Sequence, residues 1–291
     1  MSDRHVYRRT GASAGGRRVR SVRPVRRASA RLSVARAGAA LAMLASAGAI
    51  YGVGASSAFA YAGLRLDGAI YTDAGAAESA IATARGQNLF RLSTAPLRAA
   101  LEQLPTVAAA DVGVQLPGTL HVTLTERVPV LVWKVGARRY LVDAGGYLFG
   151  RLGDKPPPQA AGLVVVDDRR AASAGLSMGL RLDPQDIDAA TRLASLVPAD
   201  VGSAATALQV RVTDENGFVV RADPQGWLAI FGFYTQSLRT TDLIPGQVRL
   251  LRSLLIGREP LIDRVILASD TDGTYVPRPT PKPSPSASLA P

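Results

Sequence analysis

An uncharged apolar span near the amino end constrains this chain more than any other feature. No charged residue occurs between Ala37 and Leu64, and residues 37–60 are mostly alanine, glycine and larger apolar residues. A helix of 24 residues rises about 36 Å, which is enough to cross a hydrocarbon core about 30 Å thick. The span therefore predicts one transmembrane helix over residues 37–60.

The charge beside this span predicts its orientation. Residues 1–36 contain eleven arginines and one aspartate, and the whole chain has a formal net charge of +11, so the rest is almost neutral. An arginine excess on one flank marks the cytoplasmic side. We expect residues 1–36 to be a disordered basic cytoplasmic tail and the remainder to be extracytoplasmic, as in a single-pass type II plasma-membrane protein. This charge lies on a tail and not on a folded face, so it does not indicate nucleic-acid binding.

A cleaved signal peptide is the alternative interpretation of the span. Ala58-Phe59-Ala60 has the small-x-small pattern that precedes a cleavage site. The uncharged run is longer than a typical signal-peptide core, however, and the basic segment before it is much longer than usual. An uncleaved anchor is favoured, and sequencing of the mature amino end would decide between the two.

The folded part has the pattern of an α+β protein with two domains. Residues 61–129 predict the order strand, helix, helix, strand, strand, with Leu97, Leu101 and Leu104 on one helix face. Residues 130–276 predict a second, β-rich domain with two helices, the first of which is capped by Asp183 and begins at Pro184. Residues 277–291 are proline-rich and predict a disordered tail.

The residue types available for chemistry are few. The chain has no cysteine and only two histidines, His5 and His121, so a cysteine nucleophile and a multi-histidine metal site are excluded. The sequence suggests no cofactor. Asp167-Asp168 could be a carboxylate pair, but Arg169-Arg170 follows at once and favours a solvated loop.

Other polar and aromatic residues receive structural interpretations. Glu126 next to Arg127 predicts a surface ion pair. His121 alternates with core residues and is expected to face solvent. Trp133 and Trp227 lie in predicted strands and are expected in the core. Asp183, Asp186 and Asp188 resemble a metal cluster only superficially, because the first two suit a helix start.

Two stretches together resemble a known family. They are GQNLFRLSTAPLRAALEQLPTVAAADVGVQLPGTLHVTLTERVPVLVW, from Gly86 to Trp133, and RRYLVDAGGYLFG, from Arg138 to Gly150. Their order after a single anchor resembles the FtsQ/DivIB-type bacterial cell-division proteins. The resemblance implies a basic cytoplasmic tail, one transmembrane helix, a POTRA domain over residues 61–129 and an FtsQ-type β domain over residues 130–276. Pro129 is then expected to break strand pairing where one domain passes to the next.

The resemblance also implies a function. It suggests a non-catalytic scaffold at the division septum that binds FtsB-like and FtsL-like bitopic proteins and possibly septal peptidoglycan synthesis proteins. It points to the carboxy-terminal strand, Thr274, Tyr275 and Val276, as the partner-binding edge, with the strand of Val112 and Val114 as the next surface. Another POTRA-bearing envelope assembly or chaperone-like factor is the alternative, although no series of barrel strands follows.

Overall fold

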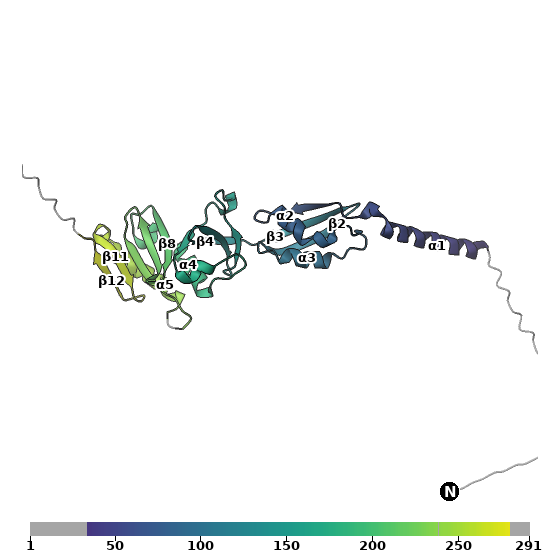
Figure 1. Cartoon of the computed structure of the whole chain (residues 1–291). Coiled ribbons are helices and arrows are strands. Elements are labelled where there is room, and N and C mark those ends of the chain that lie inside the picture. The colour runs from purple at the N-terminus through teal and green to yellow at the C-terminus, as the bar shows by residue number, and fades with distance from the viewer. Residues whose placement is uncertain (1–33, 238, 280–291) are drawn as a thin grey trace, which may run out of the picture. The chain divides into compact units, whose positions relative to one another are not determined.

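The computed structural model describes residues 34–237 and 239–279 (Figure 1). The basic tail up to residue 33 and the proline-rich tail from residue 280 lie outside the described residues, and the predictions made for them stay predictions. The chain divides into two compact units, residues 1–52 and residues 53–291.

The first described element is helix α1, Val34–Ala55. Its length and composition are sufficient to cross a membrane. The helix ends five residues before the predicted boundary at residue 60, because Ser56 has an extended backbone and its side chain accepts a hydrogen bond from the Ala58 amide at 3.1 Å. That bond begins a short 3-10 helix, Ser57–Phe59.

A small domain follows, with the predicted order strand, helix, helix, strand, strand. Its sheet has the strand order β1-β3-β2, in which β1 is parallel to β3 and β2 is antiparallel to β3. Both outer strands therefore have one unpaired edge within this sheet. The elements are β1 Gly63–Asp67, α2 Ala74–Ala80, a 3-10 helix Ala82–Ala84, α3 Thr94–Glu102, β2 Val107–Gln115 and β3 Thr119–Glu126.

The core of the small domain follows from the helix and strand periodicities. Leu97 and Leu101 on α3 are buried as predicted, whereas Leu104 is only partly buried. Alternate residues of β3, Leu120 and Val122, are fully buried in the same cluster. One face of the sheet is thus covered by α3, and burial of the side chains is the main stabilising contribution.

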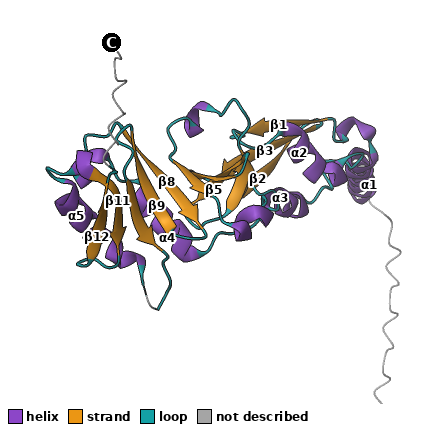
Figure 2. Cartoon of the chain, turned by 60° about the vertical axis from the view of Figure 1, so that its left-hand side comes forward, coloured by secondary structure: helices purple, strands orange, loops and turns teal. Residues whose placement is uncertain are grey.

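The large domain is built on one sheet of nine strands, in the order β12-β11-β10-β9-β8-β7-β4-β5-β6 (Figure 2). Its strands are β4 Pro129–Val135, β5 Arg138–Asp143, β6 Leu148–Arg151, β7 Val165–Asp168, β8 Ala207–Thr213, β9 Gly217–Asp223, β10 Leu228–Gly232, β11 Ile262–Leu267 and β12 Gly273–Pro277. Its helices are α4 Pro184–Ala194 and α5 Ile244–Leu255, with 3-10 helices at Pro158–Ala160, Ala171–Gly175, Pro198–Val201, Thr241–Leu243 and Glu259–Leu261. The α+β class is confirmed.

Both helices contribute to the main core of the large domain. Helix α4 contacts β4, β7, β8 and β9, and α5 contacts β10, β11 and β12. Trp133 and Trp227 are completely buried in this core, as predicted. Alternation along β4 directs the neighbouring residue Val132 into a separate cluster with Phe149. The nine-stranded sheet therefore has apolar packing on two faces around β4.

Pro129 does not break strand pairing, which corrects the sequence prediction. It is the first residue of β4 and lies opposite Asp143 of β5, with a register shift before Leu131. Proline is tolerated at the first position of a strand because no earlier ladder bond needs its missing N–H group. The domain boundary therefore lies at Arg127 and Val128.

Candidate functional site

The predicted partner-binding residues Thr274, Tyr275 and Val276 lie on the edge strand β12. This strand pairs with β11 on one side and is the last strand of the sheet. Tyr275 is 41% exposed and Val276 is 43% exposed. An edge strand presents backbone groups to solvent and can accept another strand.

The backbone direction along β12 follows from one hydrogen bond just beyond its end. The Arg278 amide donates to the Leu261 carbonyl at 2.7 Å, so it faces the β11 side. Backbone groups alternate along a strand, so Val276 and Thr274 also face β11 and Tyr275 and Pro277 face outward. The Tyr275 N–H and C=O groups therefore point away from β11 at the centre of the edge. Pro277, which has no N–H group, also points away from β11, so no bond of the β11–β12 ladder is lost there.

The second predicted surface is the edge strand β2 of the small domain. Val114 is 40% exposed, but Val112 is only 8% exposed and its side chain belongs to the core. Val112 can therefore offer a partner its backbone but not its side chain. The structure brings these two residues onto one strand, in a different sheet from Tyr275.

Glu126 does not form the surface ion pair predicted with Arg127. Its carboxylate accepts backbone hydrogen bonds from the amides of Ile70, Tyr71 and Thr72, at 2.6 to 3.0 Å. Three amides that converge on one carboxylate form strong charge-assisted hydrogen bonds. Glu126 therefore fixes the loop after β1 to the end of β3.

Arg127 joins the small domain to the large domain. Its guanidinium donates to the Pro105 carbonyl at 3.1 Å and to the Asp143 carboxylate at 2.9 Å. It also lies 4.4 Å from the centre of the Tyr147 ring, which is a cation–π arrangement. Glu126 and Arg127 thus have two separate roles, one within the small domain and one between the domains.

Asp168 is buried, which corrects the prediction of a solvated loop. It is the last residue of β7 and is 1% exposed. Its carboxylate accepts hydrogen bonds from the Trp133 indole at 3.1 Å, from the Ser173 hydroxyl at 2.6 Å and from the Arg170 guanidinium at 2.8 Å. Burial raises the pKa of Asp168, but the hydrogen bonds from Arg170 and Ser173 outweigh burial, and the pKa lies below its ordinary value.

The aspartates around α4 each have a different partner. Asp183 accepts from the Gln185 amide and caps the helix as predicted, at 2.8 Å. Asp186 pairs with Arg170 at 2.8 Å, and Asp188 pairs with Arg192 at 3.0 Å. Across residues 34–237 and 239–279, no three histidine, cysteine, aspartate or glutamate side chains gather as a metal-binding group.

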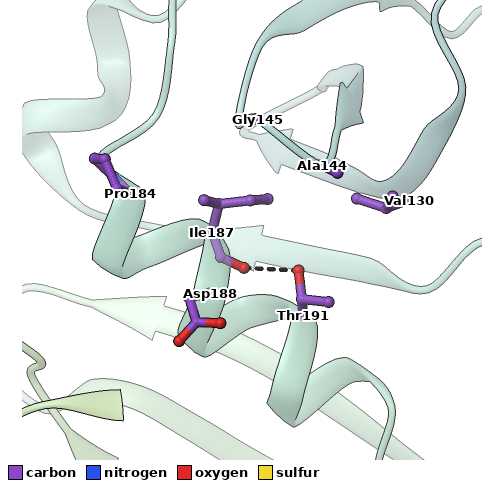
Figure 3. Close-up of a pocket in the computed structure, with 7 residues that line it drawn as sticks. All are labelled: Val130, Ala144, Gly145, Pro184, Ile187, Asp188 and Thr191. Atoms are coloured by element: carbon purple, nitrogen blue, oxygen red, sulfur yellow. Dashed lines mark hydrogen bonds between the residues drawn. The ribbon is translucent and has the colours of Figure 1, made fainter.

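A cavity of about 310 Å³ lies between α4 and the β5–β6 turn (Figure 3). In the close-up Ile187 points toward Val130 and Ala144, and the Thr191 hydroxyl donates to the Ile187 carbonyl at 2.7 Å. Asp188, the one carboxylate drawn, is held by Arg192 and Thr241. The cavity is thus lined mostly by apolar and internally bonded groups. His121 lies elsewhere, half exposed on β3 with its Nε2 atom 2.7 Å from an Asp67 carboxylate oxygen.

The family comparison assigns the small domain. The family model for the POTRA domain, FtsQ-type, matches residues 62–127, which covers all five of its strands and helices. This small domain is a POTRA domain of the FtsQ type. The order of strands and helices predicted for this domain is confirmed.

Three curated relatives agree with this assignment, and each carries the name cell division protein FtsQ. The protein of Chloroflexus aurantiacus is 32% identical over 98 residues, which are 34% of each chain. That of Mycobacteroides abscessus is 34% identical over 87 residues, or 30% of this chain and 27% of the relative. That of Chloroflexus aggregans is 30% identical over 118 residues, or 40% of this chain and 42% of the relative. The matched parts span less than half of each relative.

Sequence reasoning missed Asp168 and Asn88. The partners of Asp168 include Trp133, which is 35 residues away, so no local signal marks it as buried. Asn88 binds the last turn of α1 through the Val53 carbonyl at 3.0 Å. An asparagine two residues after Gly86 was compatible with an ordinary loop.

Proposed function

We propose that this protein is a membrane-anchored scaffold of the cell-division machinery that holds a partner at the β12 edge. The observation that carries the proposal is the outward backbone of Tyr275 on an exposed edge strand, at the end of a nine-stranded sheet. An extended segment of a partner can add to such an edge as a further strand. Main-chain hydrogen bonds then supply affinity, and side chains on alternate positions supply specificity.

The side chains beside this edge suit a partner strand that carries both apolar and acidic residues. Ile266 on β11 is 37% exposed and lies opposite Thr274, and Val276 lies opposite Arg264. A bound strand could thus continue an apolar surface and place an acidic side chain near Arg264. The family resemblance suggests FtsB-like and FtsL-like bitopic proteins as partners, and septal peptidoglycan synthesis proteins as further ones.

A backbone substitution tests strand addition directly. Tyr275→Pro removes an N–H group from the outward edge but none from the β11–β12 ladder, so the sheet should persist. We expect this variant to lose co-purification with the FtsB-like protein, while Tyr275→Ala, which keeps the N–H group, retains most of it. Unchanged tryptophan fluorescence of both variants would show that the large domain is folded, because both tryptophans lie in its core.

Truncation before Thr274 provides the complementary test. It removes nearly all of β12 and should also abolish co-purification. Full partner affinity in both the truncated chain and Tyr275→Pro would contradict the proposal and would direct attention to β2, where Val114 is exposed.

The cellular role and topology have their own test. A fluorescent fusion to the amino end should form a ring at midcell, with residues 1–33 in the cytoplasm and the folded domains outside. An even envelope signal would contradict a division role and would favour another POTRA-bearing envelope assembly or chaperone-like factor.

A further inference from the structure

The POTRA domain has an end that is built directly onto the end of α1. We call this end the membrane-proximal tip and define it as residues 56–62, 84–92 and 115–119. We propose that the membrane-proximal tip binds the surface of the bilayer, with Phe90 and Leu116 in the headgroup layer and Arg91 on anionic lipid headgroups. The proposal rests on α1 being the membrane anchor and does not involve the β12 edge.

Hydrogen bonds tie the tip to the last turn of α1. The Asn88 side-chain amide donates to the carbonyls of Val53 at 3.0 Å and of Ser56 at 2.9 Å. These are carbonyls at a helix end, which have no partner inside the helix. The Leu89 amide donates to the Phe59 carbonyl at 2.8 Å, which continues the connection beyond the helix. The loop of residues 84–92 therefore cannot move away from the helix end without the loss of these bonds.

The length of the helix places its end at the membrane surface. From Arg36 to Ala55 the helix rises about 30 Å, which equals the thickness of a hydrocarbon core. Arg36 then lies at one boundary and Ala55 at the other. Phe59 follows Ala55 by only four residues, so the tip bonded to it is held at the level of the lipid headgroups.

Two exposed apolar side chains lie in the tip. Phe90 is 52% exposed and contacts Phe59 edge-to-face, with ring centres 4.8 Å apart. Leu116 is 49% exposed and lies in the β2–β3 turn. The Ala62 amide donates a hydrogen bond to the Gly118 carbonyl of this turn at 2.7 Å. Aromatic rings are favoured at membrane–water interfaces, and burial of apolar area there adds to the binding.

The charge of the tip suits an anionic surface. Its three segments contain Arg85 and Arg91 and no aspartate or glutamate. Arg85 pairs with Glu78 at 3.3 Å, whereas Arg91 has no ion pair within the described part of the chain. The side-chain stem of Arg91 lies beside Gly54, 3.7 Å from the position a Cβ atom would occupy there. An arginine next to the end of a membrane helix can reach lipid phosphates.

Lipid-borne quenching of single labels on the full chain tests the proposal. The chain has no cysteine, so Phe90→Cys and Leu116→Cys can each be labelled with an environment-sensitive fluorophore in a nanodisc that holds one copy. Ile70→Cys is the matched control, because Ile70 is also 52% exposed but lies at the Glu126 end of the POTRA domain. We expect doxyl-labelled lipids to quench the labels at positions 90 and 116, and aqueous iodide to quench the label at position 70.

The contribution of charge is measured with the label at position 116. Arg91→Ser should lower the equilibrium constant for lipid contact roughly fivefold in discs with phosphatidylglycerol, and much less in discs of phosphatidylcholine alone. Labels at 90 and 116 that iodide quenches as strongly as the label at 70 would overturn the proposal. Protection of the labels at 90 and 116 from iodide that appears only in discs with two copies, whatever the lipid, would also overturn the proposal. The tip would then contact a second chain. Failure of the chain to enter discs would instead refute the anchor itself.

Discussion

Substitution of Asp168 by asparagine should destabilise the large domain far more than the same change at the neighbouring residue. Asp168→Asn keeps the shape of the side chain but removes the charge that Arg170 contacts at 2.8 Å. The Arg170 side chain is only 19% exposed and would retain Asp186 alone. Loss of one partner of a buried pair costs about 3–5 kcal/mol, and we expect about 2–4 kcal/mol here because one carboxylate remains.

Asp167→Asn is the matched control. Asp167 pairs with Lys134 and Arg169, whose side chains are 38% and 55% exposed. Exposed pairs of this kind contribute about 0–1 kcal/mol. Urea denaturation of the full chain in detergent, followed by tryptophan fluorescence, measures both variants. Equal losses for the two variants, or a loss below about 1 kcal/mol for Asp168→Asn, would refute the reasoning.

The same carboxylate predicts a pH dependence. The pKa of Asp168 is lowered in the folded state, so its stabilising contribution is fully present above the unfolded pKa of about 3.9 and is lost as pH falls through the folded value. The difference in unfolding free energy between the unsubstituted protein and Asp168→Asn should be constant near neutral pH and should shrink below about pH 4. A difference that grows in acid would contradict this assignment.

Three further predictions concern other parts of the chain. Leu101→Ala, at a fully buried site on α3, should lower POTRA stability by about 2–5 kcal/mol, seen as faster amide hydrogen exchange in β2 and β3 with no change in the large domain. Arg127→Ala should speed exchange in the Asp143–Tyr147 turn, while both domains keep their own cores; unchanged exchange would mean that the junction does not depend on the guanidinium. A cysteine at Ser13 should be shielded from an impermeant reagent in intact cells, whereas one at the exposed Glu215 should react, and the reverse labelling would refute the proposed topology.

The elements of the POTRA domain could be predicted because their signals are local. Leucines at helical spacing mark α3, and strict alternation from Leu120 to Leu124 marks β3. Alternation in the sequence predicts a strand only from Asp111, four residues after β2 begins at Val107, since Val107 is followed by three alanines, which have low strand propensity. There the pairing with β3 overrides the propensity.

The polar contacts could not be predicted because they depend on tertiary neighbours. Glu126 binds amides 54 to 56 residues earlier in the chain, and its position beside Arg127 suggested a different partner. Asp168 looked solvated because two arginines follow it, but a side chain at the end of a central strand lies where the fold encloses it. The strand order of the large sheet, with its parallel pairs β4–β7, β7–β8 and β10–β11, likewise depends on packing against α4 and α5. The β12 edge was predicted as a strand, and its role in binding stays a prediction.

The position of β12 in chain order has a consequence for quality control during synthesis. A polypeptide is made from its amino end, and among the described residues β12 is the last strand of the sheet in sequence and lies at its edge. A chain that stops short of Gly273 could still build the eight preceding strands, but it would expose β11 in place of β12 at the edge. A partner that recognises the Tyr275 backbone would therefore select chains that include β12, and chains that stop before it would be left out of the assembly.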